Sequence, residues 1–106
     1  AKEYGYTVEY ENTTFAGVLT GVSAGKYDIG VSGITVTDER KESVDFSDVY
    51  HTEDIVVVTK KSADVQGLAQ FENATLGVVT GSLYGGYSRE QFPNASIKEF
   101  NTFADA

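Results

Sequence analysis

The sequence predicts an α/β protein in which most strands run parallel. Short apolar runs rich in β-branched residues alternate along the chain with segments whose apolar residues recur every three or four positions. Hydrophobic residues make up 41% of the 106 residues and aromatic residues 12%, which is too many for a disordered acidic segment. This length fits one small domain or part of a larger one.

The first half of the chain contains two predicted helices with clear starts. One spans Thr14 to Ala24, where four apolar side chains recur at positions i, i+3, i+4 and i+7, and Gly25 ends it. The other begins after Thr37, whose hydroxyl can cap the helix, and Asp38 and Glu39 follow in the first turn, where the helix dipole favours acids. The remaining predictions here are a last helical turn at residues 2–4 and strands at residues 6–10, 28–32 and 44–46.

The second half of the chain continues the alternation. Residues 55–59 are β-branched throughout, which predicts a strand buried on both faces. Leu76 to Thr80 is a further buried strand, and the helix predicted from Ser82 to Phe92 is stopped by Pro93. A short helix at residues 64–71 and a strand at residues 97–100 complete the prediction.

Two predicted strands end in the same way, one at Ser32-Gly33 and the other at Thr80-Gly81. Ligands of open α/β sheets bind just beyond the carboxyl ends of strands, so these two ends could face each other across a cleft. Ser-Gly and Thr-Gly are also ordinary turn formers, and the pattern fits both interpretations equally well.

Arg40 is a candidate anion ligand. With Thr37 as N-cap it falls in the first helical turn, where a cation opposes the helix dipole at a cost of about 0.3–1 kcal/mol. A bound carboxylate would reverse that balance, because the guanidinium fork can donate two hydrogen bonds to it. The alternative is an arginine that points into solvent or pairs with Asp38 or Glu39.

The turn Gly81-Ser82-Leu83 is a second candidate anion site. It begins a predicted helix whose backbone N–H groups could receive an anion, and Gly81 would let the ligand come close. The glycines do not match a phosphate loop or a dinucleotide fingerprint. Turn chemistry alone also explains these residues.

The composition excludes several other functions. Sixteen acids against eight Lys and Arg give a net charge of −8, which argues against nucleic acid and anionic lipid as partners. The absence of cysteine excludes disulfides and thiolate chemistry, and one histidine, His51, gives no zinc set, so we expect neither metal nor cofactor. The acid pair Glu53-Asp54 is too ordinary in so acidic a chain to indicate a catalytic pair. No apolar run approaches the length of a membrane span.

The strings at residues 25–28, 32–40 and 44–48 carry a resemblance, of which Ser32-Gly33-Ile34-Thr35-Val36-Thr37-Asp38-Glu39-Arg40 is the most specific. They resemble the polar amino-acid family of type II extracellular solute-binding proteins, bacterial family 3, the receptors of ABC importers. Residues 76–84 resemble the second lobe of the same family. The resemblance implies an internal fragment of a type II periplasmic-binding-protein fold, with residues 1–56 as the latter part of lobe 1 and residues 57–106 as the first part of lobe 2, joined by a crossing strand.

The resemblance also implies a role for several residues. Arg40 would hold the α-carboxylate of an amino acid in a bidentate pair, and the Thr35 hydroxyl and N–H would add to that grip. The Gly33 carbonyl would accept from the α-ammonium group. Phe15 matches an aromatic residue that lines the pocket in some members.

In the second lobe the resemblance implies that Ser82 and the Leu83 N–H touch the same carboxylate on closure, with Gly81 giving access. Leu83 stands where many members carry a hydroxyl or glycine, so only its backbone can serve. The family's first strand, its return crossing strand and the second-lobe aspartate that usually pairs with the ammonium would lie outside residues 1–106.

The implied function is amino-acid binding by clamshell closure, in the periplasm or outside the cell, with or without a lipid anchor, and with an ABC permease as partner. The alternatives are a sensor or receptor domain of the same fold and a prephenate or arogenate dehydratase-like enzyme on the same scaffold, although no acid catalyst is evident. We expect weak or no binding by these residues alone, and self-association through exposed strand edges.

Overall fold

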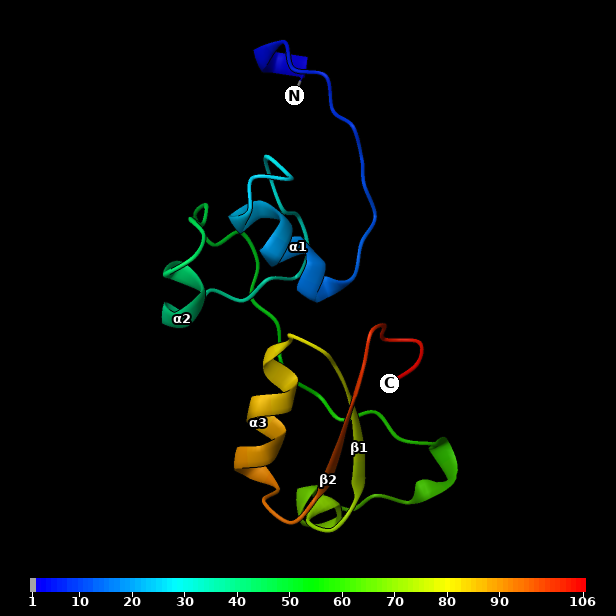
Figure 1. Cartoon of the computed structure of the whole chain (residues 1–106). Coiled ribbons are helices and arrows are strands. Elements are labelled where there is room, and N and C mark those ends of the chain that lie inside the picture. The colour runs from blue at the N-terminus through cyan, green and yellow to red at the C-terminus, as the bar shows by residue number, and fades with distance from the viewer. Residues whose placement is uncertain (1) are drawn as a thin grey trace.

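The computed structural model describes residues 2–106 as an elongated mixed α/β chain measuring 52 × 29 × 23 Å (Figure 1). Two groups of elements follow each other along its length. We call residues 11–41, which carry two helices, the helical part, and residues 75–100, which carry two strands and a helix, the sheet part. The elements are η1 (Lys2–Tyr4), α1 (Phe15–Ser23), α2 (Asp38–Lys41), η2 (Lys61–Ala63), η3 (Leu68–Phe71), β1 (Thr75–Val79), α3 (Leu83–Gln91) and β2 (Ser96–Phe100).

Helix α1 begins and ends where its sequence predicts. The Thr14 side chain accepts a hydrogen bond from the Gly17 N–H at 3.2 Å, which caps the first turn. At the other end Gly25 adopts a left-handed conformation with φ +72°, the usual glycine stop. Gly21 is buried under the Tyr27 ring, which would overlap any Cβ at that position. The turn that follows the helix therefore packs against α1 itself.

Helix α2 is only four residues long and depends on its cap. The Thr37 side chain accepts from the Arg40 N–H at 3.2 Å, and Asp38 and Glu39 occupy the first turn as expected. This confirms the predicted helix start. The cap also fixes the backbone of Arg40, the residue on which the candidate site depends.

The sheet part holds the buried core of the described residues. Strands β1 and β2 pair in parallel, from Thr75 opposite Ser96 to Val79 opposite Phe100, and α3 connects them (Figure 1). The buried apolar side chains are Val78, Val79 and Phe92. The predictions of β1, α3 and β2 are confirmed to within one residue at each end.

Four predicted strands are wrong for the described residues: 6–10, 28–32, 44–46 and 55–59 form neither strand nor helix. The run at 55–58 shows why, because no neighbouring strand offers it backbone hydrogen bonds and Val58 is 88% exposed. The expected crossing strand is thus a connecting segment without strand pairing. The helix expected at 64–71 is replaced by the short 3-10 helix η3.

Candidate ligand-binding site

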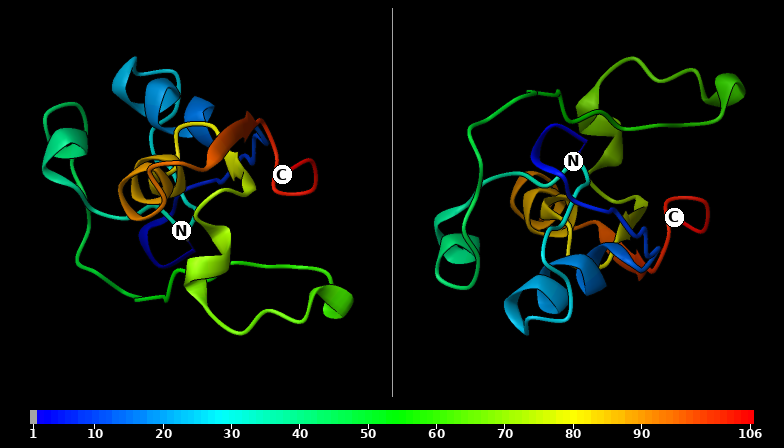
Figure 2. Two further views of the ribbon diagram at one scale, coloured as in Figure 1. Left: turned by 90° about the horizontal axis from the view of Figure 1, so that it is seen from below. Right: turned by 90° about the horizontal axis from the view of Figure 1, so that it is seen from above.

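Arg40 joins the helical part to the sheet part. Its Nη1 donates to the Thr35 carbonyl at 2.7 Å, and its Nη2 donates to the Gly81 carbonyl at 3.0 Å. Figures 1 and 2 show the turn between β1 and α3 next to the start of α1, with α2 off to one side. The sequence marks both Arg40 and Gly81 as anion-site candidates, and the structure brings them into direct contact.

The Phe15 ring lies beside the same guanidinium. Phe15 is the first residue of α1, and its ring centroid is 5.6 Å from Cζ of Arg40, within cation–π range. A guanidinium carries five N–H donors, of which two are used by the carbonyls of Thr35 and Gly81. Arg40 is therefore held in place and keeps donors for a further acceptor.

Both the backbone conformation and the neighbouring atoms require a glycine at position 81. Its φ is +77°, a left-handed conformation that side chains rarely adopt. A Cβ at this position would also lie 3.0 Å from the Cβ of Ala16 in α1. The space that the sequence assigns to an approaching ligand is therefore partly occupied by the first turn of α1.

The Ser82 hydroxyl is engaged within its own turn. It donates to the Val79 carbonyl at 2.5 Å and accepts from the Tyr84 N–H at 3.3 Å, so its single proton is already used. Leu83 is the first residue of α3, and its N–H has no partner within the helix. In this conformation the backbone of Leu83, rather than the Ser82 side chain, is the donor available to an anion.

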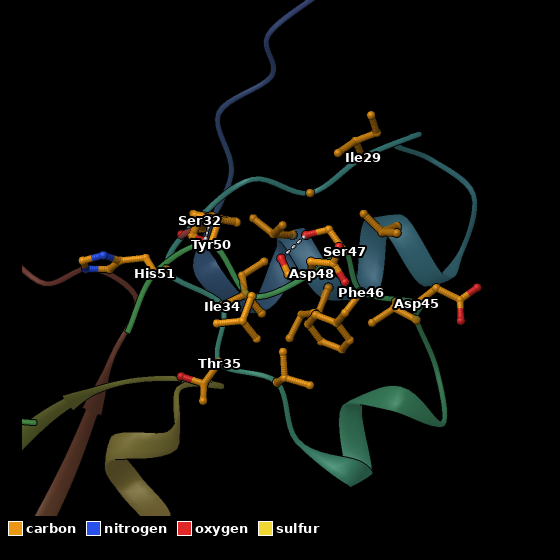
Figure 3. A pocket seen from close by; sticks show the side chains of 18 of the residues that line it. Ile29, Ser32, Ile34, Thr35, Asp45, Phe46, Ser47, Asp48, Tyr50 and His51 are labelled. Atoms are coloured by element: carbon orange, nitrogen blue, oxygen red, sulfur yellow. Dashed lines mark hydrogen bonds between the residues drawn. The ribbon is translucent and has the colours of Figure 1, made fainter. Parts of the chain in front are cut away.

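Gly33 and Thr35 lie on the wall of a large cavity in the first half of the chain. The cavity has a volume of about 840 Å³, is open to solvent on one side and is lined by residues between 18 and 53, among them Ile34 and Phe46 (Figure 3). Neither Arg40 nor any residue of the 81–83 turn lines it. Thr35 is the link between this cavity and the Arg40 contact, because its carbonyl accepts from Arg40.

His51 points away from the other labelled side chains of the cavity wall (Figure 3). Among residues 2–106 no three His, Cys, Asp or Glu side chains are grouped as metal ligands would be. No helix in that range is long and apolar enough to cross a membrane.

The comparisons with known proteins identify the family. Residues 1–104 match the family described as bacterial extracellular solute-binding proteins, family 3. The chain belongs to this family. Among its relatives, the arginine-binding extracellular protein ArtP of Bacillus subtilis is 37% identical over 98 residues, which cover 92% of this chain and 38% of ArtP. The glutamine-binding protein GlnH of the same organism is 35% identical over 83 residues, covering 77% of this chain and 30% of GlnH.

One solved structure matches the whole chain. The ancestral amino acid-binding protein AncCDT-1, a precursor of cyclohexadienyl dehydratase, superimposes with a TM-score of 0.88 at 36% identity, covering 100% of this chain and 48% of AncCDT-1. The expected family and α/β fold class are thereby confirmed. The chain spans less than half the length of each of these three relatives. All three are described as binding proteins, and AncCDT-1 is also described as a precursor of an enzyme, cyclohexadienyl dehydratase.

One contact in this region is not predicted by the sequence. Glu53 lies beside Gly33, where its Oε1 would be 3.2 Å from a Cβ built on the glycine. The sequence offers no signal for this contact, because an adjacent acid pair is unremarkable in a chain of charge −8.

Proposed function

We propose that the chain is part of an amino-acid receptor of an ABC importer, and that Arg40 binds the α-carboxylate of the amino acid. The observation that carries the proposal is the Arg40 guanidinium, which is fixed by two backbone carbonyls and keeps free N–H donors. Family membership supports the binding of a solute outside the cell, and relatives named as arginine- and glutamine-binding support an amino acid.

The remaining predicted residues take supporting roles in this proposal. The Phe15 ring shields one side of the guanidinium, and Thr35 anchors the guanidinium through its carbonyl. The Leu83 N–H adds a donor from the start of α3, and Ser82 would join only after its hydroxyl leaves the Val79 carbonyl. Gly81 keeps the two parts close. Residues 1–56 and 57–106 would belong to two lobes that close on the ligand.

Closure then has a simple electrostatic basis. The bond from Arg40 to the Gly81 carbonyl crosses from the helical part to the sheet part. A carboxylate bound at Arg40 would therefore lie close to the N-terminus of α3. The N–H groups there favour an anion, and the charge-assisted bonds would be stronger than those to neutral carbonyls. The whole receptor would work outside the cell or in the periplasm with a permease as partner.

Isothermal titration calorimetry on the full-length gene product tests the proposal. L-arginine, L-glutamine, L-histidine and L-cystine are the ligands, and agmatine, which is arginine without its carboxylate, is the control. We expect at least one amino acid to bind and agmatine to fail. Binding of none of the four, or equal binding of arginine and agmatine, would contradict the proposal.

A dehydratase is the second candidate function, favoured by the similarity to AncCDT-1. Incubation of the same protein with prephenate or arogenate distinguishes it. Product formation would show that the protein is an enzyme, whereas amino-acid binding without turnover supports a receptor.

A further inference from the structure

Three of the four asparagines begin an Asn-x-Ser/Thr triplet, the acceptor sequence for N-linked glycans. They are Asn12, Asn73 and Asn94. The chain has eleven threonines and eight serines among its 106 residues, so fewer than one of its four asparagines would begin such a triplet by chance. The triplets are therefore enriched in this sequence.

Asn73 and Asn94 lie in two turns that share both sequence and structure. Residues 71–75 and 92–96 each follow the pattern Phe-x-Asn-Ala-Thr/Ser. In each, the alanine N–H donates to the phenylalanine carbonyl at 3.0 Å, so the asparagine is the third residue of a closed β-turn. The residue with the hydroxyl is then the first residue of β1 or of β2. The two phenylalanine rings pack edge to face with centroids 6.1 Å apart, which holds the two turns side by side.

The acceptor groups of both turns are accessible. Asn73 and Asn94 are exposed, and so are Thr75 and Ser96, the hydroxyl residues of their triplets. Within residues 2–106 neither the Asn73 amide nor the two hydroxyls take part in a side-chain hydrogen bond. The Asn94 Nδ2 donates to Oε1 of Glu72 at 2.8 Å and keeps a second N–H. Both amide nitrogens can therefore accept a substituent.

The two turns also lie away from the candidate ligand-binding site. They precede the amino ends of β1 and β2, which point away from α1 and α2 in Figure 1, whereas the Gly81 turn follows the carboxyl end of β1. A bulky group on either turn would leave the contact between Arg40 and Gly81 uncovered. The third triplet differs, because Asn12 is three residues before Phe15 and its Thr14 hydroxyl already caps α1.

We propose that Asn73 and Asn94 are N-glycosylation sites that receive an oligosaccharide from a polyprenyl diphosphate. Nδ2 of the asparagine forms a bond to C1 of the first sugar, the bond from that carbon to the diphosphate oxygen breaks, and the released diphosphate takes the proton that Nδ2 gives up. Membership in an extracellular family supports the assignment, because such glycans are added to chains that leave the cytoplasm. The modification goes beyond the proposed function and does not depend on ligand binding at Arg40.

Peptide mass spectrometry tests the assignment on the full-length gene product isolated from the cells that naturally produce it. Trypsin cuts after lysine and arginine, which places Asn73 on the peptide of residues 62–89 and Asn94 on the peptide of residues 90–98. We expect both peptides to carry a sugar mass increment that fragmentation locates on the asparagine. Asn101 lies on the next peptide and begins no triplet, so it is the internal control and should be unmodified.

Two substitutions at Thr75, made in the same cells, separate a triplet-dependent glycan from any other modification. Thr75→Ala removes the hydroxyl that the triplet requires, so T75A should lose the sugar on Asn73 and keep the sugar on Asn94. Thr75→Ser keeps the hydroxyl and should retain both sugars. An unmodified Asn73 or Asn94 in the wild-type protein, sugar on Asn101, or a T75A protein still glycosylated at Asn73 would overturn the assignment.

Discussion

Arg40 and Gly81 lie 41 residues apart in the sequence and are joined by a 3.0 Å hydrogen bond from Nη2 to the carbonyl oxygen. The bond connects the first turn of α2 to the turn that precedes α3. The surroundings of both residues favour this contact. The Thr37 cap fixes the backbone of Arg40, and the lack of a side chain on Gly81 allows Ala16 to lie close to it. A ligand that binds Arg40 must therefore share the guanidinium with this carbonyl.

Gly81→Ala tests the contact between the two parts. A methyl group at φ +77° and 3.0 Å from the Ala16 Cβ should lower the free energy of unfolding by about 1–2 kcal/mol, measured by urea denaturation. Gly86→Ala is the matched control, since Gly86 lies within α3 and nothing is within 4 Å of its Cβ position. That control should stabilise the protein by about 0.5–1 kcal/mol. Equal effects of the two substitutions would refute the close packing.

Thr37→Ala tests the support of Arg40 by its helix cap. Loss of the Thr37 hydroxyl leaves the Arg40 N–H without its acceptor and should cost about 1 kcal/mol of stability. Because α2 has only four residues, we also expect weaker amino-acid binding in titration calorimetry. Thr37→Ser keeps the hydroxyl and should behave as the wild type. A T37A protein with full affinity would show that the cap does not position Arg40.

Phe15→Leu removes the ring beside the guanidinium while keeping an apolar side chain at the start of α1. A cation–π contact at a partly exposed site is worth about 0.5–1 kcal/mol, so we expect about a 3-fold loss of amino-acid affinity. Phe15→Tyr preserves the ring and should retain the affinity. Equal amino-acid affinities of the leucine and tyrosine variants would show that the Phe15 ring does not contribute to ligand binding.

Glu11 provides a pH-dependent contact that ties the segment before α1 to the turn after it. Hydrogen bonds from Lys26 Nζ at 2.7 Å, and then from the Tyr27 hydroxyl at 2.9 Å, hold the pKa of Glu11 below its ordinary value of 4.5. A lowered pKa in the folded state means that this contact stabilises the fold above about pH 4.5 and is lost as the pH falls through the folded pKa.

An NMR titration of the Glu11 carboxyl measures this effect. The substitution Lys26→Gln removes the charged Lys26 hydrogen bond, which lowers the pKa of Glu11 more than the Tyr27 bond does. The pKa of Glu11 should therefore rise toward 4.5. Lys41→Gln, which removes the partner of Asp38 instead, should leave the Glu11 titration unchanged. The same Glu11 pKa in the wild type and in K26Q would show that the ion pair does not persist in solution.

The helices α1, α2 and α3 could be predicted from the sequence because their signals are local. Thr14, Thr37 and Ser82 each precede a helix, and each accepts a hydrogen bond from a backbone N–H of the first turn. Such a cap depends on residues two or three positions apart. The same local chemistry places Arg40 in the first turn of α2.

The strands divide according to whether a partner is present. Strand β1 pairs with β2 because α3 returns the chain alongside it, whereas the β-branched run at residues 55–58 finds no neighbouring strand in the described chain. Side-chain type predicts an affinity for a sheet, but the hydrogen bonds that define a strand come from another segment.

The candidate site is predictable in its members but not in its connections. Arg40 and Gly81 stand out as separate anion sites, yet their mutual bond depends on tertiary placement. Glu53 becomes notable only because the chain folds its carboxylate against Gly33. These two contacts join residues that lie far apart in the sequence, so no local pattern predicts them.

The affinity of Arg40→Ala for an amino acid that the wild type binds is the most direct test of carboxylate recognition. Titration calorimetry on the full-length gene product should show a loss of at least about 10-fold, and of 100-fold or more if both bidentate bonds are made. Lys41→Ala, a loss of positive charge at the adjacent residue, serves as the control and should bind normally. An R40A protein that binds the amino acid as tightly as the wild type would contradict the assignment.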